Sequence, residues 1–163
     1  MDNIKFRPYQ KSDFDTISCL LEDFIDYLAS LDPDKRIVKQ ADYGNNYLRK
    51  TLKEVNNKNG SFIIAEIENK IVGFGVAIVE KLSQNDLMEV LPHTPGRIIE
   101  LYVDSKYRGK GIGTQLMQQL ESYLKQKGCQ TIHIEVYAPN VKTHKLYKRF
   151  GYSDRNIDML KLL

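Results

Sequence analysis

Three glycines alternate with other residues in one short segment, Arg108-Gly109-Lys110-Gly111-Ile112-Gly113. Glycine adopts positive φ and lets a ligand approach the backbone closely. Successive N–H groups can then converge on an anion at the start of a following helix, where the helix dipole favours negative charge. The spacing fits neither the GxxxxGK[ST] loop nor the GxGxxG fingerprint. The segment therefore predicts a pyrophosphate site, and a basic surface turn is the alternative.

The residues on both sides of this turn predict a strand and then a helix. Residues 98–103 read IIELYV, and apolar residues recur at helical spacing from Ile112 to Leu124. The remaining patterns predict strands at 4–7, 62–67, 71–79 and 131–136, helices at 14–28, 43–54 and 140–149, and a final strand pair around Tyr152 and 158–162. This order predicts one α/β domain over residues 1–163, a mixed sheet with helices on both faces.

Composition and charge exclude several classes of protein. The chain has 163 residues, 42% hydrophobic and 28% charged, which fits one packed domain and argues against disorder. A formal charge of only +3 argues against a protein that coats nucleic acid. Residues 1–103 carry 13 basic and 16 acidic side chains, whereas residues 104–163 carry 11 basic and 5 acidic. The C-terminal part therefore suits an anionic ligand.

The cysteines and the apolar runs bear on metals, membranes and compartment. Cys19 and Cys129 lie far apart without a ligand-spacing pattern, so we expect neither a metal site nor a disulfide framework. The longest apolar run, Ile71–Val79, is too short to span a bilayer, and the beginning of the chain does not read as a signal peptide. We therefore expect a cytoplasmic protein with no membrane partner.

Two linked motifs carry a resemblance to a known family. The Arg-x-x-Gly-x-Gly pattern that begins at Arg108 resembles the acyl-CoA-binding motif of the GNAT superfamily of N-acetyltransferases. Downstream, Asn140-x-x-Thr143-x-x-x-Tyr147-x-x-x-Gly151-Tyr152 looks like that family's N-x-x-A-x-x-x-Y-x-x-x-G-F pattern, with Thr for Ala and Tyr for Phe. The match covers residues 98–152. It implies the GNAT fold, a mostly antiparallel six- to seven-stranded sheet with a splay between strands 4 and 5.

The resemblance also implies acetyl-CoA, or another acyl-CoA, as co-substrate. The pantetheine arm would enter the splay and pair with the backbone around Leu101, Tyr102 and Val103, as an added strand would. Asn140 would hydrogen-bond this arm, and it can also cap the helix that follows. The pyrophosphate would lie on the turn and the start of its helix, that is on Arg108, Gly109, Lys110, Gly111, Ile112, Gly113 and Thr114.

Two residues are predicted to be catalytic. Tyr147 is the expected general acid, because a phenol with a pKa of about 10 can donate a proton to a leaving thiolate. The alternative is an ordinary half-buried tyrosine. Glu100 is the expected base for the amine, and the alternative is a sheet-surface glutamate in a salt bridge. Strand alternation predicts that Glu100 shares a face with Ile98 and Tyr102.

The implied function is transfer of an acetyl group to a primary amine of a small molecule or protein, by direct attack in a ternary complex and without a metal. The resemblance leaves a homodimer open. A polycationic acceptor is suggested by an acidic set, with a solvated helix face as the alternative: Glu22, Asp23, Asp26, Asp32 and Asp34. The alternative function is a non-catalytic acyl-CoA-binding sensor or regulatory module. A nucleic-acid-binding regulator rests only on the basic C-terminal part, so we expect no nucleic-acid partner.

Overall fold

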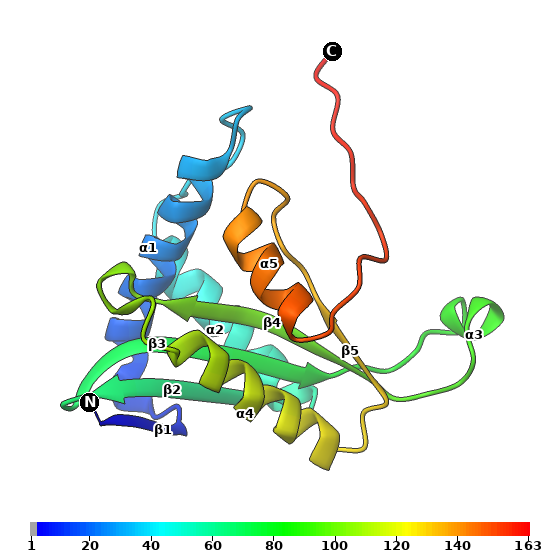
Figure 1. Cartoon of the computed structure of the whole chain (residues 1–163), viewed down its shortest axis with the longest axis horizontal. Coiled ribbons are helices and arrows are strands. Elements are labelled where there is room, and N and C mark those ends of the chain that lie inside the picture. The colour runs from blue at the N-terminus through cyan, green and yellow to red at the C-terminus, as the bar shows by residue number, and fades with distance from the viewer. Residues whose placement is uncertain (1–2) are drawn as a thin grey trace.

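A five-stranded sheet forms the centre of the computed structural model, which describes residues 3–163 (Figure 1). The strands lie in sequence order, and each is antiparallel to its neighbour except the last pair, which is parallel. They are β1 (Ile4–Pro8), β2 (Ser61–Ile67), β3 (Lys70–Val79), β4 (Pro95–Val103) and β5 (Thr131–Ile134). The predicted mixed, mostly antiparallel sheet is confirmed.

Helices cover both faces of the sheet, as the apolar periodicities predict (Figure 1). One face packs against α1 (Phe14–Leu31) and α2 (Tyr43–Asn57), and the other against α4 (Ile112–Gln126) and α5 (Val141–Arg149). Short helical turns lie in the connections, at η1 (Lys11–Asp13), α3 (Asp86–Glu89) and η2 (Ser105–Tyr107). No helix in the described part of the chain is both long and apolar enough to cross a membrane.

The β4 and β5 strands pair over only four residues each, from Pro95 opposite Thr131 to Ile98 opposite Ile134. After Ile98, β4 continues to Val103 along β3 alone, while the chain beyond β5 turns toward α5. The two strands therefore part in the middle of β4, and the predicted splay is confirmed.

A β-bulge in β4 changes which side chains share a face. Ile98 and Glu100 pair with consecutive residues of β3, which leaves Ile99 as an extra residue. Ile98 consequently packs with α4, whereas Glu100 contacts Tyr47 of α2. The prediction that Ile98 and Glu100 lie on one face is wrong, because the two-residue period of a strand is interrupted at the bulge.

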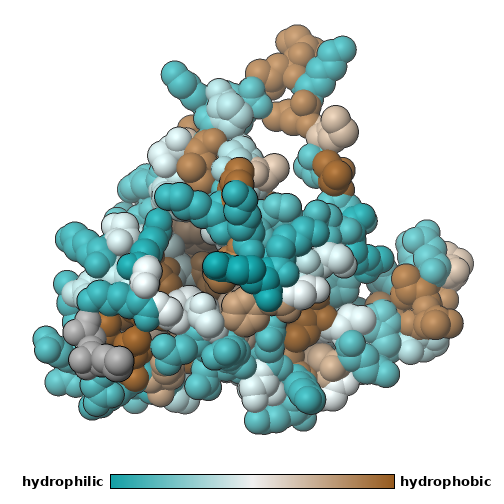
Figure 2. Space-filling model, in the orientation of Figure 1, coloured by the Kyte–Doolittle hydropathy of each residue, from teal (hydrophilic) through white to brown (hydrophobic). Residues whose placement is uncertain are grey.

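The end of the chain forms no strand. Residues 152–163 have no regular structure and extend away from the body (Figure 1). Apolar side chains such as Ile157 and Met159 are exposed there, and Figure 2 shows hydrophobic residues along this projecting end of the chain. The predicted final strand pair is therefore wrong, and the sheet of the described residues has five strands instead of six or seven. A strand needs a neighbour for its backbone hydrogen bonds, and local alternation does not supply one.

Candidate functional site

The unpaired half of β4 directs peptide groups into the splay. The N–H of Asp104 donates to the carbonyl of Val72 on β3, at 2.9 Å. Alternate residues of an antiparallel strand bond to the same neighbour, so the peptide groups of Leu101 and Val103 point away from β3. Those of Tyr102 point toward β3, and its ring packs against α1. Two of the three predicted backbone positions therefore present hydrogen-bonding groups to the splay.

The glycine-rich turn at the end of β4 forms an open cradle of amide groups. Gly109 and Gly111 have φ values of 81° and 80°, a left-handed conformation that favours glycine. Residues 112–114 form the first turn of α4, and their N–H groups have no acceptor within the helix. The first helical hydrogen bond runs from the N–H of Gln115 to the carbonyl of Gly111. A Cβ at Gly109 would meet no atom within 4 Å. The turn thus fits an anionic group such as a pyrophosphate.

Arg108 folds back over the end of β4. Its Nε donates to the carbonyl of Val103 at 2.9 Å. Its guanidinium carbon lies 4.6 Å from the ring centroid of Tyr27 on α1 and 5.6 Å from that of Tyr102. The positive charge of Arg108 is therefore held at the mouth of the splay. The ammonium of Lys110 lies 5.8 Å from the Tyr107 ring centroid.

Glu100 is buried in the middle of the site. Glu100 is only 6% exposed, and its carboxylate accepts a hydrogen bond from the Tyr47 hydroxyl. Burial raises the pKa of Glu100 to about 7, although the Tyr47 hydrogen bond and the charge of Lys50 act in the opposite direction. Glu100 forms no ion pair within residues 3–163 and is not a sheet-surface residue. It has the environment of a group that can exchange protons near neutral pH.

Tyr147 lies on α5, also 6% exposed, with its ring 6.0 Å from that of Tyr152. Its hydroxyl has no hydrogen-bond partner in the described part of the chain, yet it retains contact with the exterior. Burial raises the pKa of Tyr147 well above the usual range, and the negative charge of Glu100 adds to the effect. The two predicted catalytic residues are therefore both buried, on elements that flank the splay.

Asn140 links the start of α5 to α1. It is the N-cap of α5, and its Oδ1 accepts from the N–H of Thr143 at 3.4 Å and from the Tyr27 hydroxyl of α1 at 3.3 Å. Asn140 is 7% exposed, and its amide nitrogen has no protein acceptor among residues 3–163. Asn140 can therefore cap α5 through its Oδ1 and still donate a hydrogen bond to a ligand through its amide nitrogen.

Sequence reasoning missed Tyr47 and Tyr43. They lie one turn apart on α2, and their rings stack with centroids 5.2 Å apart. Burial raises the pKa of Tyr43 to about 12, and the charge of Glu100 adds to the effect. The available signal was an aromatic pair at helical spacing, and nothing local indicated that it faces a strand 53 residues away.

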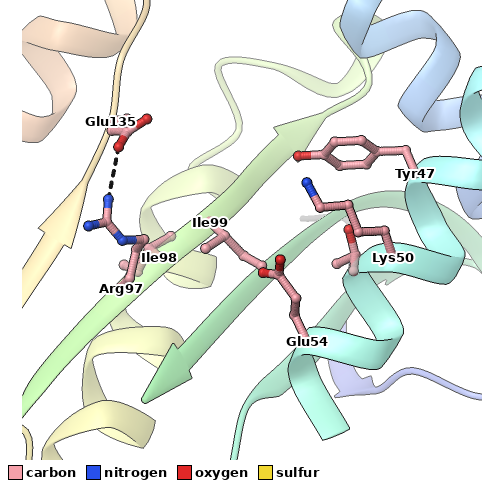
Figure 3. Close-up of a pocket in the computed structure, with 8 residues that line it drawn as sticks. Tyr47, Lys50, Glu54, Arg97, Ile98, Ile99 and Glu135 are labelled. Carbon is pink, nitrogen blue, oxygen red and sulfur yellow. Dashed lines mark hydrogen bonds and ion pairs between the residues drawn. The ribbon is translucent and has the colours of Figure 1, made fainter. Parts of the chain in front are cut away.

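A cavity of about 210 Å³ lies between α2 and β4, where β4 and β5 part (Figure 3). Arg97 and Glu135 form its β-sheet side and are ion-paired at 2.9 Å. Tyr47 lines this cavity, and its hydroxyl binds Glu100. Its lining residues are Tyr47, Lys50, Thr51, Glu54, Arg97, Ile98, Ile99 and Glu135.

The acidic set near α1 is largely engaged within the protein. The Asp32 carboxylate accepts from three N–H groups of the following loop and from the Tyr137 hydroxyl at 2.7 Å, which lowers its pKa. Lys39 lies 2.7 Å from Asp26 and 3.8 Å from Glu22. Three of the five predicted acceptor-binding acids thus have internal partners.

Residues 3–163 contain no group of three or more His, Cys, Asp or Glu side chains that could hold a metal ion. Cys19 and Cys129 are free, and burial raises the pKa of the Cys129 thiol.

Curated relatives of this chain include acetyltransferases. It is 28% identical over 139 residues to an uncharacterised N-acetyltransferase of Methanocaldococcus jannaschii, covering 84% of this chain and 58% of that protein. It is 26% identical over 161 residues to glucosamine 6-phosphate N-acetyltransferase 1 of Dictyostelium discoideum, covering 97% of this chain and 90% of that protein. The chain spans 58% and 54% of the length of two M. jannaschii relatives.

Solved structures share the fold, and a family model matches most of the chain. A mutant of the BH1408 protein from Bacillus halodurans has a TM-score of 0.84 at 20% identity and covers 98% of this chain and 99% of its own. An aminoglycoside N-acetyltransferase in complex with CoA has a TM-score of 0.67 at 15% identity, and the match covers 100% of this chain and 96% of that chain. The model of the Acetyltransferase (GNAT) family matches residues 20–152. With its splayed sheet and its glycine-rich turn at the end of β4, this protein belongs to the GNAT family of acetyltransferases.

Proposed function

We propose that this protein transfers an acetyl group from acetyl-CoA to a primary amine, by direct attack of the amine within a ternary complex. The proposal is carried by one observation: Glu100 and Tyr147 are both buried on elements that flank the splay, and the negative charge of Glu100 contributes to the raised pKa of Tyr147. A module that only binds acyl-CoA needs the turn at the end of β4 and neither of these two residues. The burial of both residues beside the splay therefore favours the enzyme over the sensor.

The GNAT family uses acetyl-CoA, and the residues of this chain fit such a co-substrate. The amides at the start of α4 and the charge of Arg108 suit the pyrophosphate, and the outward peptide groups of β4 suit the pantetheine arm. When bound, acetyl-CoA supplies the thioester-activated acetyl group. The proposed binding residues are Leu101, Val103, Arg108, Gly109, Lys110, Gly111, Ile112, Gly113, Thr114 and Asn140, whereas the peptide groups of Tyr102 are engaged with β3.

Glu100 is the proposed base. An amine that resembles lysine is protonated near neutral pH, because its pKa is about 10.4. Burial brings the pKa of Glu100 to about 7, which makes it a stronger proton acceptor than an ordinary carboxylate. The Tyr47 hydroxyl fixes the position of the carboxylate. Glu100 accepts one proton from the attacking amine, directly or through one water.

Tyr147 is the proposed acid. Its raised pKa keeps the phenol protonated over the whole working pH range. The hydroxyl has no protein partner in the described residues, so it is available to donate its proton toward the departing sulfur. The protonated amine loses two protons in all: one replaces the proton that Tyr147 gives to the thiol, and the other leaves Glu100 for the solvent. Outward N–H groups of β4 can polarise the carbonyl of the acetyl group.

The acceptor is proposed to be a primary amine of a small molecule or protein. Named relatives act on glucosamine 6-phosphate and on aminoglycosides. The engagement of Asp26 and Asp32 within the protein weakens the case for a polycation. Two free cysteines fit the reducing cytosol as the compartment.

Thiol release from acetyl-CoA across a panel of primary amines tests the proposal, with Glu100→Gln and Tyr147→Phe as the variants. Turnover that depends on an amine and falls in both variants supports an acetyltransferase. Tight binding of CoA by calorimetry with no turnover on any amine overturns it in favour of the sensor.

A further inference from the structure

The cavity between α2 and β4 carries a positive charge that the proposed mechanism does not use. Lys50 reaches into it from α2 and points toward β4, beside the Tyr47 hydroxyl (Figure 3). Its ammonium lies 5.9 Å from the Tyr47 ring centroid and forms no ion pair with any residue between 3 and 163. Arg97, the other cation of the lining, pairs with Glu80 at 3.0 Å and with Glu135 at 2.9 Å. Lys50 is thus the cavity's available cation.

Lys50 lies close to the reacting end of the site. Its charge acts on Glu100, and it follows Tyr47, the partner of Glu100, by three residues on the same helix. The Tyr47 side chain thus contacts Glu100 through its hydroxyl and has the Lys50 ammonium 5.9 Å from its ring centroid. A small amine that reaches Glu100 along Tyr47 would therefore pass close to this ammonium.

The phosphates of the co-substrate are expected elsewhere. The cavity lies at Ile98 and Ile99, whereas the turn follows Val103. Five residues of strand span roughly 17 Å, so Lys50 and the amides of α4 serve opposite ends of β4. Glu54 lies one turn beyond Lys50 and also lines the cavity, so a second anionic group is disfavoured there.

We propose that this cavity binds a small primary amine that carries one anionic group, a carboxylate or a phosphate, and that Lys50 binds this group. The inference rests on the proposed function, since it assigns the acceptor of that reaction. Charge-assisted hydrogen bonds from an ammonium to a carboxylate or phosphate are short and strong. The same cation repels a polycation, which agrees with the internal engagement of the acidic set.

Matched amines and matched variants test the assignment. β-Alanine and propylamine differ by a carboxylate, and phosphoethanolamine and ethanolamine differ by a phosphate, so the two pairs distinguish the two anions. We expect kcat/KM to be about tenfold higher for the anionic member of at least one pair. Lys50→Ala should remove this preference, mainly through KM, and Lys50→Glu should invert it. Lys53→Ala is the control, because Lys53 is exposed on the same helix and does not line the cavity.

Binding provides a second readout that does not require turnover. Calorimetry of each amine with the CoA-saturated protein should show binding of an anionic amine that Lys50→Ala abolishes and Lys53→Ala retains. Such binding without any thiol release would support the inference and overturn the proposed function. Turnover or binding that is equal within each pair, or that is unchanged in Lys50→Ala, would overturn the inference and leave the proposed function standing. Absence of any amine binding and of any turnover would also overturn it.

Discussion

The phenol of Tyr47 donates a hydrogen bond to the carboxylate of Glu100 and so joins α2 to the bulged part of β4. Burial raises the pKa of Glu100 to about 7, and the Tyr47 hydrogen bond limits this rise. Tyr47 therefore influences both where the carboxylate lies and the pH at which it becomes a base.

Replacing Tyr47 by Phe removes this donor and keeps the ring that stacks on Tyr43. Glu100 must be ionised to accept a proton, so kcat/KM for the amine rises with pH through the pKa of Glu100. Loss of the hydrogen bond raises that pKa. We therefore expect the acidic limb of the kcat/KM profile to shift to higher pH by about one unit. Profiles with one acceptor amine at saturating acetyl-CoA measure the shift, because the amine titrates identically with both proteins. Tyr43→Phe is the control, and an unmoved limb in Tyr47→Phe contradicts the relationship.

Glu100 also makes stability depend on pH. Its pKa is about 7 in the folded protein against an ordinary value of 4.5, so the folded state holds more protons between these values. The free energy of unfolding therefore falls as pH rises through this window, by about 3 kcal/mol if the whole shift is realised. Glu100→Gln abolishes this loss, so the variant should gain stability relative to the wild type on going from about pH 4 to about pH 8.

Denaturant unfolding of both proteins at the two pH values measures this gain, and parallel pH dependences would show that Glu100 is not the group concerned. The same variant should lower kcat about a hundredfold with little change in the KM for acetyl-CoA. Greater stability combined with lower activity is the signature of a carboxylate kept buried for its chemistry.

The sequence predicted the elements whose signals are local. A strand, alternating glycines and an apolar stripe at helical spacing follow one another within residues 98–124, and each is readable from near neighbours. The cap at Asn140 and the burial of Tyr147 belong to the same class, since both follow from the start and the inner face of one short helix.

The features that escaped prediction depend on distant partners. The bulge at Ile99 depends on how β4 pairs with β3, and the contact of Tyr47 with Glu100 depends on how α2 packs on the sheet. Asp32 looked like a surface acid, whereas the loop after α1 folds around its carboxylate. The alternation of residues 158–162 predicted a strand that finds no neighbour in the described chain.

Gly109 and Gly128 provide a matched pair for testing the turn. Their φ values are 81° and 79°, and a Cβ at either position would meet no atom within 4 Å. Alanine at either position should therefore cost about 1–2 kcal/mol of backbone strain. Only Gly109→Ala should also weaken CoA binding, by about tenfold, because its methyl group occupies the open side of the cradle. Calorimetry with CoA measures this, and equal affinities would remove the turn as the anion site.

Arg108 should contribute mainly to binding. It lies at the mouth of the splay, against Val103 and Tyr27, so its contacts with a co-substrate would exist before the reaction as well as during it. Arg108→Ala should therefore raise the KM for acetyl-CoA about tenfold and change kcat less. Lys106→Ala removes an exposed charge from the neighbouring turn and should leave both constants near the wild-type values. A loss confined to kcat in Arg108→Ala would assign Arg108 a different role.

Tyr147 and Tyr152 offer the clearest separation of chemistry from stability. The two rings are neighbours, but the Tyr152 hydroxyl donates to Glu121 at 2.9 Å, whereas the Tyr147 hydroxyl has no protein partner in the described residues. Tyr147→Phe should therefore leave the melting temperature nearly unchanged and lower kcat by about 10²-fold, because the leaving sulfur loses its proton donor.

Tyr152→Phe should show the opposite pattern, a loss of about 1 kcal/mol of stability with kcat retained. Thermal unfolding and steady-state thiol release on both variants measure the contrast. If Tyr147→Phe keeps full kcat, another donor must protonate the sulfur. Since the phenol would then have no role in the reaction, its unpartnered hydroxyl would be a feature of packing alone.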